Sequence, residues 1–319
     1  MDTLGASARI AEQPAFAAGL VSDYGEAALA NLAANRRVFD RLDWWLVQEW
    51  ALSDAFIAVG REQDLLGAML AAPVLLDDIN RLASARSDAA WLRWCAIRDG
   101  VSATPLVRAM VQACSAALQR AGVGRLMCVA EPVHWLTPHL RDLGFRRVDD
   151  VVTLALRRAD WRAGPRALRP APAIRARLAE ASDMPAVLDV DNRAFEPQWR
   201  LSAQALDHAW RVSAILQVAE WAGQVAGYLL ATRLGDEAHI ARLAVSPHCQ
   251  GQGIGSALLH SALVRLLDSG AVQLVTLNTQ ASNAASLALY RRFGFQPARP
   301  RLRVMSLNLE RAASRVSSP

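Results

Sequence analysis

Lysine is absent from the sequence, although the chain carries 35 basic residues, and every one of them is arginine. The formal net charge is +5. The arginines are scattered along the chain, whereas a nucleic-acid site needs a basic face or a helix that enters a groove. We therefore attribute the exclusive use of arginine to a compositional bias of the genome, and we expect no nucleic-acid partner.

Long apolar runs are also missing. No stretch approaches the roughly eighteen apolar residues that a membrane-spanning helix needs. The first residues, Met1 to Ser7, lack the basic start and the apolar core of a signal peptide. We expect a cytoplasmic protein with no membrane partner.

Cysteine is scarce, and its spacing excludes the common metal motifs. The chain has four cysteines and no C-x-x-C pair. Cys95, Cys114 and Cys128 lie in apolar surroundings and should pack as small hydrophobic residues. Cys249 stands beside His248, but two ligands are too few for a zinc site. We expect no metal.

The chain is long enough for two domains, since it has 319 residues, of which 53% are apolar. The first 35 residues are rich in alanine and favour helix, and residues 37–52 favour a helix or a loop. The next elements are a hairpin over residues 55–70, strands at 91–97 and 125–130, and helices at 104–120 and 135–143. Residues 158–172 are rich in Arg, Ala and Pro and predict a linker.

The pattern of elements recurs after the linker. It predicts a strand at 174–178, a helix from 184, a hairpin over 214–232, strands at 239–245 and 272–279, helices at 253–268 and 283–293, and a last strand at 304–309. Leu143-Gly144-Phe145 and Phe293-Gly294-Phe295 stand 150 residues apart, and each ends a short helix. We predict an α/β (mixed α+β) fold with two tandem domains, residues 1–157 and 173–319, each a mostly antiparallel central sheet flanked by helices.

A glycine-rich turn, Gln250 to Ser256, joins the strand ending at Val245 to the helix that starts at Gly253. Such a turn directs several backbone N–H groups at one point, at the positive end of the helix dipole, and therefore predicts a phosphate site. It is not a Walker loop, because there is no lysine. It is not a dinucleotide-binding fingerprint, because Gly251, Gly253 and Gly255 alternate as G-x-G-x-G after a hairpin.

The spacing that does fit is Gln250-x-x-Gly253-x-Gly255. A second signature follows, Asn283-x-x-Ser286-Leu287-x-Leu289-Tyr290-x-x-x-Gly294-Phe295. With both motifs in order, the segment from about Ala173 to Leu309 resembles the GNAT superfamily of N-acetyltransferases. The resemblance implies an enzyme that uses acetyl-CoA as its donor.

The physics of the motifs agrees with this implication. The N–H groups of the turn can hold the pyrophosphate of acetyl-CoA. The resemblance implies that the strand before the turn pairs with the pantetheine arm, that the Val245 N–H polarises the thioester carbonyl, and that Tyr290 protonates the departing thiolate. The expected cofactor-binding residues are Leu243, Ala244, Val245, Gln250, Gly251, Gln252, Gly253, Ile254, Gly255, Ser256, Asn283 and Tyr290.

The general base is harder to assign. In the subgroup that acetylates protein N-termini, which this half resembles, an acidic residue lies five positions before the motif asparagine, and Asn278 occupies that position here. Asp236 and Glu196 are substitutes, and we place Glu237 and His239 first as catalytic candidates. A water chain would make a side-chain base unnecessary.

The first half lacks the motif residues. The offset of 150 puts Ala103 at the Gly253 position, Val133 at Asn283 and Leu140 at Tyr290. We expect this half to be a degenerate copy that supports the fold, walls the substrate pocket or holds a partner.

The leading hypothesis is an acetyl-CoA-dependent N-acetyltransferase in which the primary amine of a small molecule or peptide attacks the thioester directly. The alternatives are a non-catalytic acyl-CoA sensor and, more narrowly, an acetyltransferase like mycothiol synthase that acts on a sugar amine. The sequence leaves open whether the chain forms a homodimer.

Overall fold

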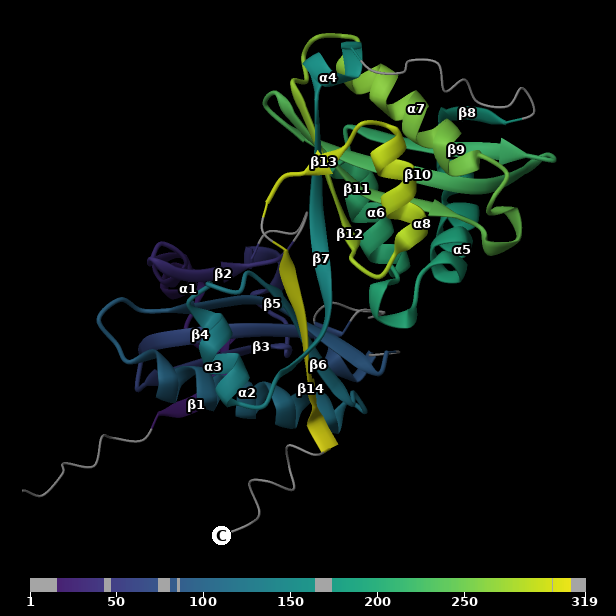
Figure 1. Ribbon diagram of the computed structural model, residues 1–319. Coiled ribbons are helices and arrows are strands. Elements are labelled where there is room, and N and C mark those ends of the chain that lie inside the picture. Colours follow the sequence, from purple (N-terminus) through teal and green to yellow (C-terminus); the bar gives the residue numbers. More distant parts are fainter. Residues whose placement is uncertain are drawn as a thin grey trace, which may run out of the picture.

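The computed structural model describes residues 16–42, 47–73, 81–84, 87–163, 174–299 and 301–310. They form two lobes (Figure 1). The lower lobe in this view contains the first half of the chain, and the upper lobe contains the second. Strand β7 (Arg146–Arg157) runs from one lobe to the other, and β14 (Leu302–Asn308) lies beside it in the lower lobe.

The first half places helices against one curved sheet. Its strands are β1 (Ala17–Leu20), β2 (Arg37–Asp40), β3 (Phe56–Arg61), β4 (Asp64–Pro73), β5 (Ala89–Ile97), β6 (Arg125–Ala130) and β7. Its helices are α1 (Glu26–Ala33), α2 (Ala103–Arg120) and α3 (Leu136–Asp142). The predicted hairpin, the two predicted strands and the long helix are all present.

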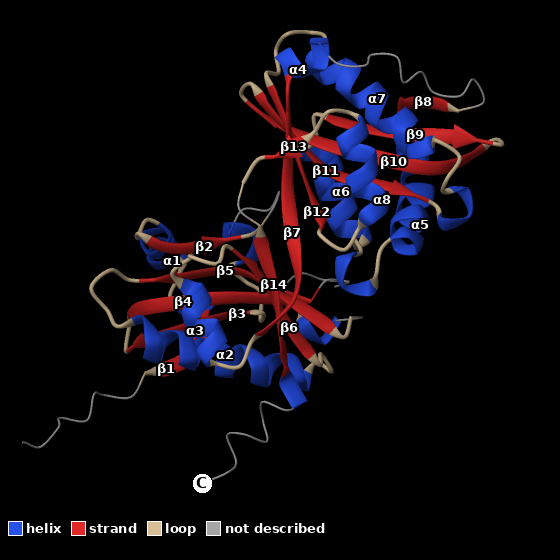
Figure 2. Ribbon diagram, viewed as in Figure 1, coloured by secondary structure: helices blue, strands red, loops and turns tan. Residues whose placement is uncertain are grey.

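The second half repeats this order with two more helices. Its strands are β8 (Arg175–Leu178), β9 (Ile215–Trp221), β10 (Gln224–Leu234), β11 (Glu237–Val245), β12 (Leu274–Gln280), β13 (Gln296–Pro297) and β14. Its helices are α5 (Met184–Ala194), α6 (Ala203–Val212), α7 (Ile254–Leu267) and α8 (Ala284–Arg292), and α4 (Arg158–Ala163) precedes them. Helices lie on both faces of this sheet (Figure 2).

The two halves share one continuous sheet. Among the described residues the strand order is β1-β3-β4-β5-β6-β14-β7-β12-β11-β10-β9-β8. The last strand, β14, pairs with β6 and β7, so it completes the sheet of the first half. In exchange, the part of β7 from Val151 to Arg157 pairs with β12 of the second half. Met305 and Leu307 of β14 accordingly lie in the core of the first half.

The mixed α/β fold with a central sheet flanked by helices is confirmed, but the two predicted sheets are joined into one. The domain limits 1–157 and 173–319 stay a prediction, and most of the predicted linker 158–172 lies outside the described residues. Three differences from the expectations stand out. Strand β7 and helix α6 were not predicted, and Arg37–Asp40 forms a strand where a helix or loop was expected. No helix in the described part of the chain is long and apolar enough to cross a membrane.

Candidate functional site

Strands β11 and β12 separate at a bulge in the middle of the second sheet. They pair in parallel only from Glu237 to Ile240. The pairing of β11 with β10 shifts register between Ile240 and Arg242, which leaves Ala241 as an extra residue. A bulge of this kind bends a strand and re-aims the residues that follow. A gap therefore opens beside residues 241–245 of β11.

The backbone of β11 turns polar groups into this gap. Ser246 donates its N–H to the carbonyl of Ala226 on β10 at 2.8 Å, and the preceding pair, Val245 and Gly227, is opposite in register. Successive residues of an antiparallel pair alternate between bonding to the partner strand and pointing away from it. The N–H groups of Val245 and Leu243 therefore point away from β10, toward the gap.

The intervening residue, Ala244, has the opposite orientation. By the same alternation its backbone groups face β10, and its side chain is buried in a core cluster with Val187 and Tyr228. Of the three strand residues expected to contact the donor, the geometry thus places Leu243 and Val245 at the gap through their backbones.

The glycine turn leads from the end of β11 into α7. Gly251 and Gly253 have φ of +78° and +85°, a left-handed conformation that favours glycine. Gly253 is the N-cap of α7, and it offers no side chain to the first N–H groups of the helix. These donors are therefore directed outward at the positive end of the helix, where an anion binds well.

Helix α8 contributes the second motif. The Asn283 side chain caps this helix by accepting the N–H of Ser286 at 3.0 Å. Tyr290 is only 5% exposed and contacts Phe295 edge to face. Burial raises the pKa of Tyr290 to about 12, against the opposing effect of a hydrogen bond from Ser286. At the end of the helix, Arg292 donates to the hydroxyl of Ser256 and so links α8 to the glycine turn.

A cavity of about 910 Å³ brings several of the predicted site residues together. Its lining includes Asn283 and Tyr290 of the α8 motif, and Leu243, Glu237, His239 and Asn278 of β11 and β12. The cavity does not include the glycine turn, Ala244, Val245, Asp236 or Glu196 in its lining. The structure thus brings the catalytic candidates to one cavity and leaves the phosphate turn outside it.

The candidate bases differ in their surroundings. Glu237 is exposed at the start of β11, whereas His239 is half-buried. The Nδ1 atom of His239 lies 2.9 Å from the hydroxyl of Thr276, and that hydroxyl is 3.4 Å from the carbonyl of Ala238. If Thr276 donates to this carbonyl, it accepts from Nδ1–H, and the basic nitrogen of the ring is Nε2. The amide oxygen of Asn278 accepts the hydroxyl of Thr153 at 2.8 Å.

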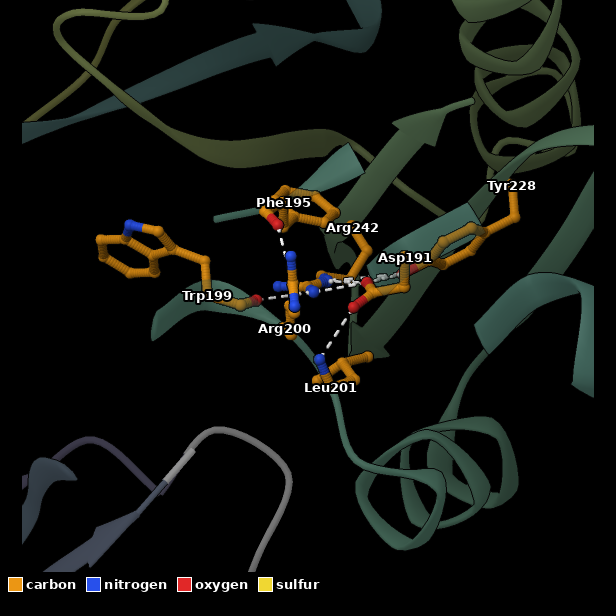
Figure 3. Close-up of polar contacts among 7 residues, drawn as sticks. All are labelled: Asp191, Phe195, Trp199, Arg200, Leu201, Tyr228 and Arg242. Carbon is orange, nitrogen blue, oxygen red and sulfur yellow. Dashed lines mark hydrogen bonds and ion pairs between the residues drawn. The ribbon is translucent and has the colours of Figure 1, made fainter. Parts of the chain in front are cut away.

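A buried charge pair joins β11 to α5 beside the cavity (Figure 3). Asp191 of α5 is fully buried, and Arg242 of β11 donates to it. Burial opposes the charged form of Arg242, but contact with Tyr228 and Asp191 raises its pKa above the usual value. Arg242 also donates to the carbonyl of Trp199 at 2.8 Å, and its guanidinium lies 4.0 Å from the ring centre of Phe195.

This pair fixes the 195–201 loop over the cavity. The loop is held at Phe195 and Trp199 by Arg242, and the N–H of Leu201 donates to Asp191 at 2.8 Å. Sequence reasoning named Glu196 of this loop as a substitute base but missed Asp191 and Arg242. The sequence did hold a signal for each residue. Asp191 is a charged residue within the apolar pattern of the helix that buries Val187 and Val190, and Arg242 is one within the strand that ends at Val245.

The first half forms part of the same cavity. Its contribution includes Arg41, Trp91, Arg93 and Glu131. Trp91 donates its indole N–H to the carbonyl of Gln198 at 2.8 Å, so it reaches the 195–201 loop directly. None of these residues was predicted, because their role depends on how the halves meet.

The corresponding gap in the first half is occupied by the chain itself. Strands β5 and β6 pair in parallel only from Ala89 to Trp91, while β4 takes the other edge of β5. Beyond Trp91, β2 pairs with β5 on the edge that faces the gap. The loop before α2 also turns two carbonyls, of Arg98 and Val101, toward the guanidinium of Arg37. In these described residues β2 therefore occupies the strand edge that a pantetheine arm would need, and the loop before α2 directs carbonyls, not N–H donors, at the guanidinium of Arg37.

The sequence matches the model of the acetyltransferase (GNAT) family over residues 184–295. It is 33% identical over 119 residues to the ribosomal protein bS18-alanine N-acetyltransferase of Escherichia coli K12, which covers 37% of this chain and 78% of that enzyme. It is 36% identical over 111 residues to a mycothiol acetyltransferase of Clavibacter michiganensis, which covers 34% of this chain and 32% of that protein.

A solved structure matches nearly the whole chain. A tandem GNAT protein from the clavulanic acid biosynthesis pathway superposes with a TM-score of 0.60 over 92% of this chain and 98% of that one. The sequence identity is 14%, so this likeness concerns the fold. It extends the similarity to the first half, which the sequence matches do not reach.

Proposed function

The chain belongs to the acetyltransferase (GNAT) family and is an acyltransferase that acts on amines, and from this premise we propose that it transfers the acetyl group of acetyl-CoA directly to a small primary amine. The observation that carries the proposal is the single cavity in which the open edge of β11, Tyr290 and His239 meet. The donor enters from the α7 and α8 side, and the amine enters from the side of the 195–201 loop.

The donor is held at both ends in this proposal. The N–H groups of the glycine turn hold the pyrophosphate, and Arg292 at the end of α8 supports that turn through Ser256. The pantetheine arm pairs with the open edge of β11 at Leu243 and Val245. The Val245 N–H then donates to the thioester carbonyl and stabilises the negative charge that develops on its oxygen.

The chemistry is a direct displacement. The amine nitrogen attacks the carbonyl carbon, the carbon–sulfur bond breaks, and the sulfur leaves as a thiolate. Tyr290 donates its proton to that thiolate, and the proton released by the amine restores Tyr290 through solvent or the base. With its pKa raised to about 12 by burial, the phenol is protonated at neutral pH, as an ordinary tyrosine also is, and so has a proton to donate.

His239 is the base that we propose in preference to Glu237. It is half-buried in the cavity wall, and its hydrogen bond to Thr276 orients the ring. Asn278, at the position of the missing acid, accepts the hydroxyl of Thr153 and cannot act as a base. A carboxylate at the exposed position of Glu237 is better placed to attract the ammonium form of the substrate than to deprotonate it.

The acceptor is a small molecule in this proposal, because residues of the first half line the cavity and narrow the space that a peptide would need. A volume of about 910 Å³ is within the range of small-molecule sites. The second candidate, an amine on a sugar, is favoured by the similarity to a mycothiol acetyltransferase. The similarity to the bS18-alanine enzyme favours a peptide amine instead.

The release of CoA thiol, measured with a panel of amines, tests this function. The panel contains small amines, an amino sugar, and peptides that begin with alanine. Turnover on a small amine supports the proposal, and mass spectrometry of the product identifies the acetylated nitrogen. Binding of acetyl-CoA without turnover on any amine would favour a non-catalytic acyl-CoA sensor.

A further inference from the structure

The wall of the cavity carries more positive than negative side chains. Among its described lining residues six are arginines, at positions 41, 93, 200, 233, 242 and 299, and three are acidic, Asp40, Glu131 and Glu237. Arg242 is neutralised by Asp191 behind the wall. With Arg93 also set aside because it has a partner of its own, four arginines face three carboxylates, so the cavity favours an anion.

Arg41 is the contribution of the first half. It follows directly on β2, the strand that fills the gap of that half, and its backbone N–H donates to the carbonyl of Arg93 at 2.7 Å. Its guanidinium donates to two carbonyls, of Val129 and Asp40, at 3.3 and 3.0 Å. Carbonyl contacts orient a guanidinium without neutralising its charge.

Arg200 is the contribution of the second half. It is half-buried in the 195–201 loop, and its Nε donates to the carbonyl of Phe195 at 3.1 Å. Within the described part of the chain, neither Arg41 nor Arg200 forms an ion pair with a carboxylate. Each therefore presents a guanidinium whose charge no neighbouring acid satisfies.

The two arginines are linked by a continuous series of contacts along the cavity wall. Arg41 bonds to Arg93 on β5, the strand that also carries Trp91. The ring of Trp91 lies 4.6 Å from that of Trp199, and Arg200 follows in the chain. The two indoles thus pack against each other in the wall of the cavity that also carries Arg41 and Arg200.

We propose that the acceptor amine carries an anionic group, a carboxylate or a phosphate, which Arg41 and Arg200 bind across the junction of the two halves. This rests on the proposed function and narrows its substrate class. A planar guanidinium matches both anions and makes charge-assisted hydrogen bonds to them. The first half then has a specific role, since it supplies one of the two arginines that select the acceptor.

Two matched pairs of amines test this subsite. O-phosphoethanolamine is compared with ethanolamine, and β-alanine with its amide, by calorimetric titration of the full chain in the presence of CoA. We expect the anionic member of at least one pair to bind at least about tenfold more tightly. The pair that shows the larger difference identifies the anion as a phosphate or a carboxylate.

Variants test whether the two arginines cause the tighter binding of the anionic amine. Arg41→Gln and Arg200→Gln should each lose most of this preference, whereas Arg41→Lys should retain part of it. Arg265→Gln, an exposed arginine on the far part of α7, is the control and should change nothing. Equal binding of the charged and neutral amines, or a preference that survives both glutamine variants, would overturn the proposal.

The titrations, combined with the assay of CoA-thiol release, distinguish this inference from the proposed function. If acetyl-CoA and an anionic amine bind but no amine releases CoA thiol, the transferase mechanism fails while the anion subsite stands. If neutral amines are acetylated as efficiently as their anionic counterparts, the transferase stands while the anion subsite fails.

Discussion

Trp91 of the first half donates its indole N–H to the main-chain carbonyl of Gln198 in the second half, at 2.8 Å. The same side chain packs on Trp199, with the ring centres 4.6 Å apart. These contacts hold the 195–201 loop from one side, and the Asp191–Arg242 pair holds it from the other. The first half therefore lines the cavity in which we propose the acceptor binds, although its own strand gap is filled.

Removing the Trp91 hydrogen bond should weaken acceptor binding. Trp91→Phe keeps an aromatic ring but loses the bond to Gln198, which contributes about 0.5–1.5 kcal/mol. We expect the KM of the amine to rise by about 3- to 10-fold while the KM of acetyl-CoA stays the same. Steady-state kinetics checks this, with Trp221→Phe as the control, because Trp221 is half-buried at the end of β9. An equal rise in both KM values would contradict the assignment.

Tyr290→Phe should lower kcat without weakening the binding of acetyl-CoA. The ring stays buried against Phe295, and only the hydroxyl that protonates the thiolate is lost. The expected loss in kcat is on the order of 10²-fold. Single-turnover kinetics and a titration with acetyl-CoA separate the two quantities. An unchanged kcat removes Tyr290 from the mechanism.

The pH profile should reflect the raised pKa of Tyr290. Burial shifts this pKa from 10 to about 12, so the phenol remains protonated where an ordinary tyrosine ionises. The contribution of the buried, neutral phenol to the stability of the fold is fully present below pH 10 and is lost as the pH rises toward 12. We expect kcat at saturating amine to stay level from about pH 8 to about pH 10. A decline centred near pH 10 would show that Tyr290 is exposed to solvent or is not the acid.

Gly253→Asp should abolish acetyl-CoA binding. The substitution places a side chain at φ +85° and a negative charge at the N-terminus of α7, where the pyrophosphate is expected. Gly223→Asp is the matched control, since Gly223 has φ +76° in the turn between β9 and β10. Both variants should lose a similar amount of stability, and only Gly253→Asp should lose acetyl-CoA binding. Retained binding in Gly253→Asp would refute the pyrophosphate assignment.

The Asp191–Arg242 pair should be important for stability. Asp191→Asn leaves a buried guanidinium without a counter-charge and should lower the free energy of unfolding by about 3–5 kcal/mol. Tyr228→Phe removes one hydrogen bond to the same carboxylate and should cost about 1 kcal/mol. Urea denaturation of both variants checks the order. Equal losses would mean that the charge on Asp191 contributes little.

Much of the second half could be predicted because its signals are local. The glycine turn, the apolar face of α7 and the Asn283 to Phe295 motif each lie within about twenty residues of sequence. Strand β7 was missed because it starts with the polar run Arg146 to Asp150, which hides the apolar pattern that follows.

The exchange of strands and the shared cavity could not be predicted in the same way. The pairing of β14 with β6 joins residues about 180 positions apart, and no local pattern specifies such a partner. The same is true of Trp91 and Gln198, which are 107 positions apart. The filled gap in the first half depends on the pairing of Arg37–Asp40 with β5, where the sequence had favoured a helix or loop.

Direct transfer at the second half is the central claim, and a rapid-quench experiment with isotopically labelled acetyl-CoA tests it most directly. The chain is mixed with one equivalent of labelled acetyl-CoA and an excess of the best amine, and protein and products are separated at each time. We predict that the label passes from CoA to the amine and never to the protein. Label on a protein side chain before it reaches the amine would contradict the account.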